Sequence, residues 1–220
     1  MKMKTRYFHD KKVHNLKSPD KIVPILCELF SPTSVVDFGC GLGTWLKSFQ
    51  DNGVRTLLGL DGEWLDKSKF EKDVLKMLQI VDLEQSIKLD LKYDLAISLE
   101  VAEHLSPAAA HLFVKNLTAA ADTIVFSAAI PFQGGQNHIN EKPLSFWIKL
   151  FQEQGFYFND VIRGRIWNDD EVFWWYKQNM VVFSSKDLNI DYVNPIDIVH
   201  PELLSQYYHS KYNLRRIIRK

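Results

Sequence analysis

The sequence predicts an α/β fold built on a doubly wound, mostly parallel seven-stranded sheet whose last strand is antiparallel. Short apolar segments alternate with helical segments along most of the chain, which is typical of β-α-β folds. The first five apolar segments contain few polar residues, as expected for strands covered on both faces. The first of them ends at Asp37 and runs into a glycine-rich turn, Gly39-Cys40-Gly41-Leu42-Gly43, before a helical segment. A strand, a glycine turn and a helix in this order hold nucleotide-like ligands in many α/β proteins.

The expected elements are bounded by turn residues and by helix start and stop signals. Pro19 occupies a first helical position, with Ser18 before it as the expected cap. Gly53 and Gly155 follow helical segments and are expected to stop them. The expected helices cover residues 19–30, 44–52, 64–75, 107–121, 141–154 and a stretch from 202 onward. The expected strands cover residues 34–38, 56–60, 78–81, 93–99, 123–129, 156–163 and 180–184.

The length of 220 residues fits one domain with an addition at each end. We expect an N-terminal arm or lid over residues 1–17, a main domain over 18–186 and a C-terminal extension over 187–220. The 27 basic and 27 acidic residues balance, so no global field favours nucleic acid. The two cysteines form no disulfide framework, which indicates a reducing, cytoplasmic compartment. No apolar run is long enough to span a bilayer, so we expect no membrane partner; the oligomeric state stays open.

The spacing of the glycine turn separates two cofactor classes. Nicotinamide dinucleotide binders use G-x-G-x-x-G, whereas this chain has G-x-G-x-G shortly after Asp37. This pattern resembles motif I of the class I S-adenosylmethionine-dependent methyltransferases, and the resemblance extends over residues 34–127. It implies a Rossmann-like class I methyltransferase domain over residues 18–186, with S-adenosylmethionine (SAM) as the cofactor. A nicotinamide-binding domain and a non-catalytic cofactor-binding protein are the alternatives.

The resemblance also implies cofactor-binding residues at the ends of successive strands. The glycines would let the backbone approach the ligand where a Cβ atom would clash. Asp37 would supply negative charge near the cofactor's ammonium group, Asp61 would accept both ribose hydroxyls, and Asp82 would accept from the adenine amino group. The whole expected set is Asp37, Gly39, Cys40, Gly41, Gly43, Asp61, Gly62, Asp82, Leu83, Leu99 and Glu100. An aspartate at a strand end is also a common turn former, which is the alternative interpretation of each aspartate.

The segment Glu100-Val101-Ala102-Glu103-His104 directly follows the fourth expected strand. On a helical turn Glu100, Glu103 and His104 would share one face. His138, in the loop after the fifth strand, would lie at the same edge of the sheet. Two carboxylates and two imidazoles suit a divalent metal such as Mg, Mn, Fe or Zn. Alternatively, His104 or His138 acts as a general base without a metal, or Glu103 caps a helix and both histidines are structural.

The same segment resembles two methyltransferase groups. E-x-x-E-H is similar to a segment of the ubiquinone-pathway O-methyltransferases. Glu100, Glu103, His104 and His138 are similar to the two glutamates and two histidines that bind a divalent metal in small-RNA 2′-O-methyltransferases. These four are therefore the expected metal ligands, and His104, Glu103 and His138 are the expected catalytic residues.

The residues expected near the methyl acceptor indicate which class of molecule the acceptor belongs to. Residues 167–176, expected on a hairpin between the last two strands, combine aromatic rings with acids, which suits sugars; packing in the core is the alternative. We therefore expect SAM-dependent O-methylation of a small-molecule acceptor such as a saccharide or biosynthetic intermediate. A metal-dependent RNA 2′-O-methyltransferase is the alternative enzyme, which the neutral net charge disfavours.

Overall fold

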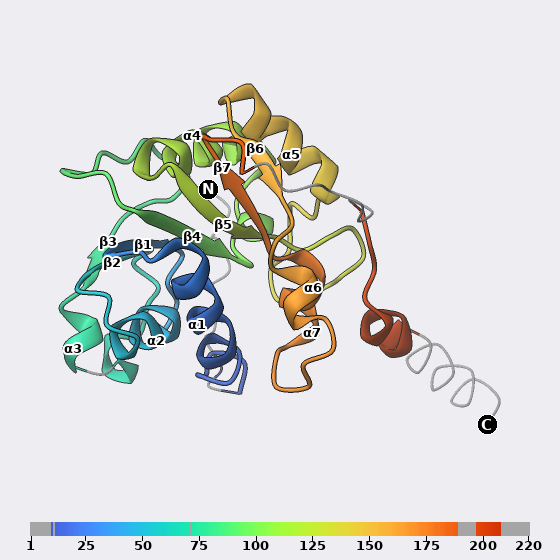
Figure 1. The fold of residues 1–220 in the computed structure, drawn as a ribbon, viewed down its shortest axis with the longest axis horizontal. Coiled ribbons are helices and arrows are strands. Elements are labelled where there is room, and N and C mark those ends of the chain that lie inside the picture. Colours follow the sequence, from blue (N-terminus) through green and yellow to red (C-terminus); the bar gives the residue numbers. More distant parts are fainter. Residues whose placement is uncertain (1–9, 11, 71, 189–196, 208–220) are drawn as a thin grey trace.

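Among the described residues, seven strands form one sheet in the order β3-β2-β1-β4-β5-β7-β6 (Figure 1). The computed structural model of the chain describes residues 10, 12–70, 72–188 and 197–207. Strands β1 to β5 run parallel, and β7 lies antiparallel to both β5 and β6. The strands are β1 (Ser34–Phe38), β2 (Thr56–Asp61), β3 (Leu78–Ile80), β4 (Leu95–Leu99), β5 (Thr123–Ser127), β6 (Tyr157–Asn159) and β7 (Val181–Ser184). The expected fold class, including the antiparallel last strand, is confirmed.

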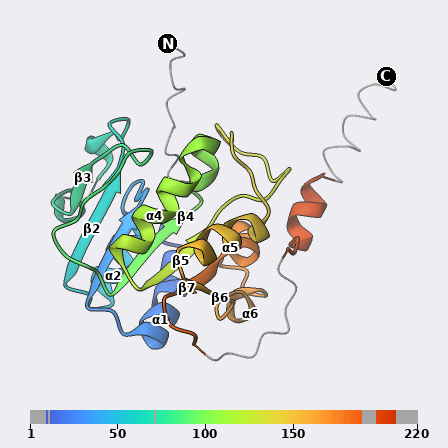
Figure 2. The same cartoon turned by 90° about the horizontal axis from the view of Figure 1, so that it is seen from above.

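Helices cover both faces of this sheet (Figures 1 and 2). The α-helices are α1 (Pro19–Phe30), α2 (Thr44–Asp51), α3 (Lys72–Leu75), α4 (Ala110–Ala120), α5 (Leu144–Glu153), α6 (Arg163–Ile166) and α7 (Trp174–Asn179). The 3-10 segments are η1 (Lys67–Lys69), η2 (Ala102–His104) and η3 (Pro107–Ala109), and residues 201–207 are also helical. Within the part of the chain that is described, no helix combines the length and apolar character that crossing a bilayer requires.

The core is divided into two layers by the sheet. Helices α4 and α5 pack on one face through Phe113 and Phe151, and α1 and α2 pack on the other through Leu26 and Phe49. Along β4, Leu95 and Ile97 belong to the second layer while Ala96 belongs to the first. This alternation follows from the two-residue period of a strand, and it explains why all five residues of β4 are buried.

The chain reverses its direction of travel across the sheet at β1. It runs from β1 to β2 and β3 on one side, then returns to place β4 and β5 on the other side. The carboxyl ends of these parallel strands share one edge. A reversal of strand order opens a crevice at that edge, where α/β proteins of this kind bind ligands. The fold therefore places the glycine turn after β1 and the segment after β4 next to each other.

The expected strand over residues 156–163 is correct only over Tyr157–Asn159. The chain then turns, and Arg163 begins α6 with its guanidinium buried. Arg163 Nη2 lies 2.6 Å from Asp160 Oδ2, three residues earlier. An extended chain would separate these residues by about 10 Å, so the buried ion pair requires a helical turn here.

The aromatic segment is also not on a hairpin, because Trp174–Asn179 forms α7. The cap expected at Ser18 is wrong as well. Ser18 already has helical backbone angles, and its hydroxyl accepts the N–H of Phe173 at 2.9 Å instead of capping α1. The expected helix over 64–75 is broken into η1 and α3, and α5 begins at Leu144 after the extended Pro143. Residues 1–9, 11, 189–196 and 208–220, parts of the expected arm and extension, lie outside the described residues.

Candidate active site

The glycine turn after β1 is fixed by packing against the chain itself. Gly39 and Cys40 donate their N–H groups to the carbonyl of Leu60, at 2.7 and 3.2 Å, which ties the turn to the end of β2. Gly39 has a φ of +90°, and a Cβ atom there would lie 2.4 Å from Cγ2 of Val101. At Gly39 a side chain of the protein already excludes a Cβ atom, and the expected close approach of the glycines to the ligand stays a prediction.

A cavity of about 850 Å³ opens at this edge of the sheet. Its walls come from the turn after β1, the ends of β2 and β4, the loop after β5, α7 and the residues before α1. Eight residues of the expected cofactor set line it: Gly39, Cys40, Gly41, Asp61, Asp82, Leu83, Leu99 and Glu100. Roughly 300–1,000 Å³ is the usual size of a pocket for a small molecule, so this cavity has room for a cofactor and a small acceptor.

Asp61 presents its carboxylate to this cavity from the end of β2. Oδ2 accepts the N–H of Gly41 at 2.8 Å, and Oδ1 accepts the N–H of Gly62 at 2.6 Å. Burial raises the pKa of Asp61 to about 6, although these two donors and the Trp64 side chain oppose the shift. Asp61 therefore carries a negative charge at neutral pH, where a ligand hydroxyl can reach it.

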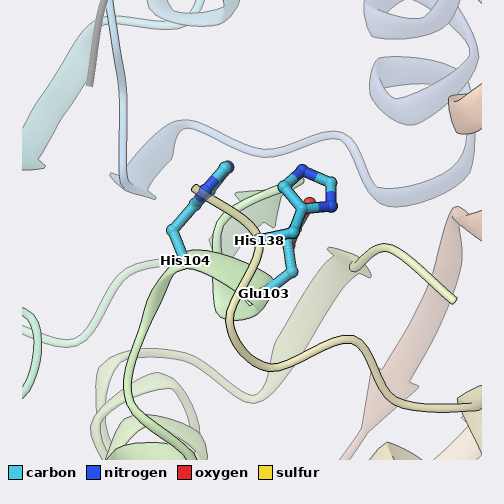
Figure 3. A group of neighbouring side chains, drawn as sticks. All are labelled: Glu103, His104 and His138. Atoms are coloured by element: carbon cyan, nitrogen blue, oxygen red, sulfur yellow. The ribbon is translucent and has the colours of Figure 1, made fainter. Parts of the chain in front are cut away.

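A second group of polar side chains lies on the same cavity wall. Glu103 and His104 come from η2, and His138 comes from the loop after β5. One ligand atom from each lies within 4.8 Å of the others, and Figure 3 shows the three side chains gathered between the two segments. The carbonyl of Glu103 accepts the N–H groups of Ile139 and Asn140, at 2.9 and 3.0 Å. These two hydrogen bonds fasten the loop to η2 and bring His138 to Glu103.

Comparison with known protein families shows to which family the chain belongs. Residues 8–125, more than half of the chain, match a family described as a methyltransferase domain. The chain belongs to this methyltransferase family. It is accordingly an S-adenosylmethionine-dependent enzyme. No curated protein matches the chain significantly.

Solved methyltransferase structures share the fold. The methyltransferase domain of a bacterial CtHen1 matches with a TM-score of 0.52 and 21% identity, over 77% of this chain and 100% of that chain. Magnesium protoporphyrin IX methyltransferase (ChlM) from Synechocystis PCC 6803, with bound SAH, matches with a TM-score of 0.54 and 17% identity, over 76% and 82%. The small RNA methyltransferase HEN1 matches with a TM-score of 0.56 and 17% identity, over 89% of this chain and 28% of that chain.

Three residues of the expected cofactor set do not line the cavity of the methyltransferase: Asp37, Gly43 and Gly62. Asp37 is 2% exposed, and its burial, together with the charge of Asp61, raises its pKa well above the ordinary value. Its expected role near the cofactor's ammonium group stays a prediction. A Cβ atom at Gly43 would lie 2.2 Å from Cγ1 of Val74, so this glycine also serves internal packing.

Asp82 lines the cavity, and its Oδ1 accepts the N–H of Glu84 at 3.0 Å, as a turn-forming aspartate does. Its expected contact with the adenine amino group stays a prediction. Leu83 beside it is buried and lines the cavity as well.

The expected helical face of Glu100, Glu103 and His104 does not form. Glu100 has a φ of +56°, and the 3-10 segment begins only at Ala102. The carboxylate of Glu100 turns to two amides, accepting from Gln133 Nε2 at 2.8 Å and from Asn179 Nδ2 at 3.1 Å. Glu100 is thus outside the cluster of potential metal ligands, which in the described residues consists of Glu103, His104 and His138.

The Glu103 carboxylate is buried without a well-oriented hydrogen bond. It is 0% exposed, and neither oxygen has a partner in hydrogen-bonding geometry among the described residues. Burial, followed by the charge of Glu100, raises its pKa well above the ordinary value, while the nearby backbone of Glu103 and Ala129 opposes this weakly. A buried carboxylate of this kind needs a positive partner to remain ionised.

The two imidazoles differ in their surroundings. Burial and the neighbouring His138 lower the pKa of His104 to about 4, against hydrogen bonds with the backbone of Asn137 and Gln136. His104 is therefore neutral at pH 7, as a metal ligand must be. His138 Nδ1 lies 2.9 Å from Oε1 of Glu141, which leaves Nε2 as the atom for a ligand or proton. Carboxylate–histidine pairs of this type orient metal-binding and catalytic histidines.

Glu141, Gln133 and Asn179 were not expected as site residues. Besides facing His138, Glu141 accepts the N–H groups of Phe132 and Gly134, at 2.8 and 2.7 Å, and so shapes the loop after β5. Its spacing of three residues from His138 is a signal that sequence inspection offers. Asn179 offers no such signal, because 79 residues separate it from Glu100.

An aromatic wall completes the acceptor side of the methyltransferase cavity. Phe173, Trp174, Trp175 and Tyr176 all line it. The rings of Phe173 and Trp175 are stacked, with centroids 4.5 Å apart and an angle of 13° between the planes. Trp174 is at the same time buried in the core, and a contact of this segment with sugars stays a prediction.

Proposed function

We propose that this methyltransferase methylates a hydroxyl oxygen of a small, uncharged, polyhydroxylated molecule such as a saccharide or a biosynthetic intermediate. The observation that carries the proposal is the Glu103, His104 and His138 cluster on the wall of the cofactor cavity. Methyl transfer needs an aligned acceptor oxygen that has lost its proton. Because an aliphatic hydroxyl barely ionises at neutral pH, a group beside the acceptor must lower its pKa or take its proton.

The three residues fit a divalent cation. One carboxylate and two imidazoles form the donor set of many Zn, Fe and Mn sites that keep open positions for a substrate. A bound cation would supply acidification of the acceptor hydroxyl. Glu103 would hold it with a carboxylate that otherwise has no partner in hydrogen-bonding geometry, and His138 would be oriented by Glu141. Without a cation, His138 paired with Glu141 is the candidate base.

The lining of the cavity supports an uncharged acceptor. None of the described residues that line it is Lys or Arg. Six of them carry carboxylates: Asp10, Asp61, Asp82, Glu84, Glu100 and Glu103. A phosphorylated acceptor would meet this negative charge with no Lys or Arg beside it among the described lining residues. The stacked Phe173 and Trp175 rings instead offer apolar surface to the faces of a sugar ring.

RNA 2′-O-methylation is the second candidate. It is favoured by the fold shared with proteins described as HEN1 and CtHen1, and by the three-residue cluster. The absence of Lys and Arg from the described lining disfavours it, because phosphate contacts supply most of the affinity for nucleic acids. A non-catalytic cofactor-binding protein would have no need for an open acceptor side beside such a cluster.

A labelled-methyl assay tests the proposal. The full chain would receive labelled SAM and one of three acceptor sets: methyl glycosides, the same glycosides as 6-phosphates, or short single-stranded RNA, each with and without chelator. We expect transfer to an unphosphorylated glycoside, with a loss of at least about 100-fold in Glu103→Gln and none in the surface control Glu153→Gln. Preferential methylation of RNA or of the phosphates would contradict the proposal. Activity that survives chelation would assign the base role to His138.

A further inference from the structure

We propose that Glu100 stays outside the cation site and receives a hydroxyl of the acceptor, with Gln133 and Asn179 as positioning residues that hold it there. This inference rests on the proposed function. It separates two tasks on one cavity wall, because Glu103, His104 and His138 surround the reacting oxygen while Glu100 binds a neighbouring hydroxyl.

The backbone of Glu100 is held in an unusual conformation. Its φ of +56° is in the left-handed region, which residues other than glycine rarely adopt. Its N–H donates to the carbonyl of Ser127 at 3.0 Å and lies 3.1 Å from the Ser127 hydroxyl. These bonds anchor Glu100 to the end of β5.

The two amides that meet the carboxylate can present only their N–H groups to it. Gln133 Oε1 accepts from Asn179 Nδ2 at 2.9 Å and from Gln178 Nε2 at 3.2 Å. Asn179 Oδ1 accepts from Gln178 Nε2 at 2.9 Å. With both amide oxygens engaged, their NH2 groups face Glu100. A turn of Glu100 toward Glu103 would leave these donors without their acceptor.

The carboxylate retains capacity for the acceptor. A carboxylate has about four lone-pair positions. Gln133 donates to Oε2, Asn179 Nδ2 lies 3.1 Å from Oε1 and 3.4 Å from Oε2, and the Ser127 side chain is a third partner. These three partners leave about one position for a ligand, and Glu100 lines the cavity from which the acceptor would reach it. Hydroxyl groups of a polyol are suitable donors, whereas a phosphate or carboxylate would be repelled.

Manganese binding distinguishes the two roles. The full chain, stripped of metal with chelator, would be titrated with Mn²⁺ as wild type, Glu100→Gln, Glu103→Gln and the surface control Glu153→Gln. We expect Glu100→Gln and the control to bind within about twofold of wild type, and Glu103→Gln to bind at least about 100-fold more weakly. A loss in Glu100→Gln as large as that in Glu103→Gln would overturn the inference and leave the proposed function intact. A wild type that binds no Mn²⁺ would overturn the cation site and with it the separation of the two roles, while the proposed function would keep His138 as its base.

The acceptor role has its own readout, with the best methyl glycoside of the activity panel as the probe. Glu100→Gln should raise the KM for the glycoside at least about tenfold, because its new NH2 group would face the NH2 groups of Gln133 and Asn179. Asn179→Leu should shift KM in the same direction. The affinity for S-adenosylhomocysteine (SAH) and the melting temperature should stay unchanged in Glu100→Gln.

An unchanged KM in Glu100→Gln would overturn the acceptor role. A panel without any methylated glycoside would count against the proposed acceptor class, and the Mn²⁺ titration would still decide whether Glu100 is a ligand.

Discussion

Single residues at the cofactor turn are constrained by contact as well as by backbone angle. Gly39 and Gly53 have nearly the same φ, +90° and +88°. A Cβ atom at Gly39 would overlap Val101, whereas a Cβ atom at Gly53 would have nothing within 4 Å. An alanine would suffer backbone strain at both glycines but steric overlap only at Gly39, so comparing the two substitutions separates the two effects.

We predict that Gly39→Ala destabilises the methyltransferase more than Gly53→Ala does. The left-handed backbone costs an alanine about 1–2 kcal/mol at either position, and overlap with Val101 adds about 1–3 kcal/mol at Gly39. Urea denaturation would measure both losses, and SAH binding should weaken only in Gly39→Ala. Adding Val101→Ala should recover part of the loss. Equal losses at the two glycines would show that the contact with Val101 is unimportant.

Asp61 makes cofactor binding depend on pH. Its pKa is raised to about 6 in the free protein, chiefly by burial, and ribose hydroxyls donate best to the ionised form. Since binding favours the ionised form, the affinity for SAH should be nearly constant above pH 6 and should fall by up to about tenfold for each pH unit below it. Calorimetry between pH 5 and 8 would measure this. Asp61→Asn should bind weakly at every pH, without the slope; a flat profile in the wild type would contradict the ribose role.

Among the elements, the loop between β5 and α5 positions His138, and it is itself held in place by several hydrogen bonds. One carboxylate, that of Glu141, accepts two backbone N–H groups of this loop and faces His138. The other end of the loop is fastened by the carbonyl of Glu103. The position of His138 therefore depends on Glu141, which does not belong to the cluster, as well as on the backbone of Glu103, which does.

We predict that Glu141→Gln lowers methyl transfer and Mn²⁺ affinity by about 10- to 100-fold each, the usual effect of removing a carboxylate behind a histidine ligand. The affinity for SAH should be unaffected, because Glu141 does not line the cofactor side of the cavity. Glu153→Gln, an exposed carboxylate on α5, is the control. Full activity in Glu141→Gln would mean that His138 needs no orientation.

Elements set by local signals could be predicted from the sequence. The bounds of α1 and β1 agree with expectation, because Pro19, the apolar pattern and the glycine turn are all local. Elements set by distant contacts could not be predicted. Residues 163–166 form α6 around the buried pair of Arg163 with Asp160, and an apolar pattern does not reveal whether a buried charge finds its partner.

The same difference between local signals and distant contacts explains which site residues could be predicted from the sequence. The acidic residues at the end of β2 and after β4, and the loop after β5, correctly predicted that Asp61, Glu103 and His138 would lie at one edge of the sheet. The three- and four-residue spacings wrongly placed Glu100 with Glu103. Its left-handed backbone and its amide partners, 33 and 79 residues away, override the local spacing.

For the molecule as a whole, the first half of the chain supplies the expected cofactor side and the second half supplies most of the acceptor side. Gly39 directly follows β1 and Asp61 ends β2, while Gln133, Phe173 and Gln206 line the cavity from later segments. Residues 197–207 are tied to α7 by two contacts. The His200 N–H donates to Gln178 Oε1 at 2.8 Å, and Lys177 Nζ lies 3.2 Å from Glu202 Oε1.

This division predicts the result of deleting residues 187–220. The affinity for SAH should stay within about threefold of wild type, since the deletion leaves β1 and β2 intact. Methyl transfer should fall, because Gln206 leaves the cavity wall and Gln178, which supports Gln133, loses its contact with His200.

The free energy of unfolding should drop by about 2–4 kcal/mol in the shortened chain. The reason is that the Lys177 side chain, 3% exposed, loses its partner Glu202, which is itself 52% exposed. Urea denaturation and calorimetry would measure both effects. Lys177→Met should recover part of the stability in the shortened chain but not in the full chain. A shortened chain that folds without binding SAH would show that residues 187–220 belong to the cofactor domain and not to an extension of it.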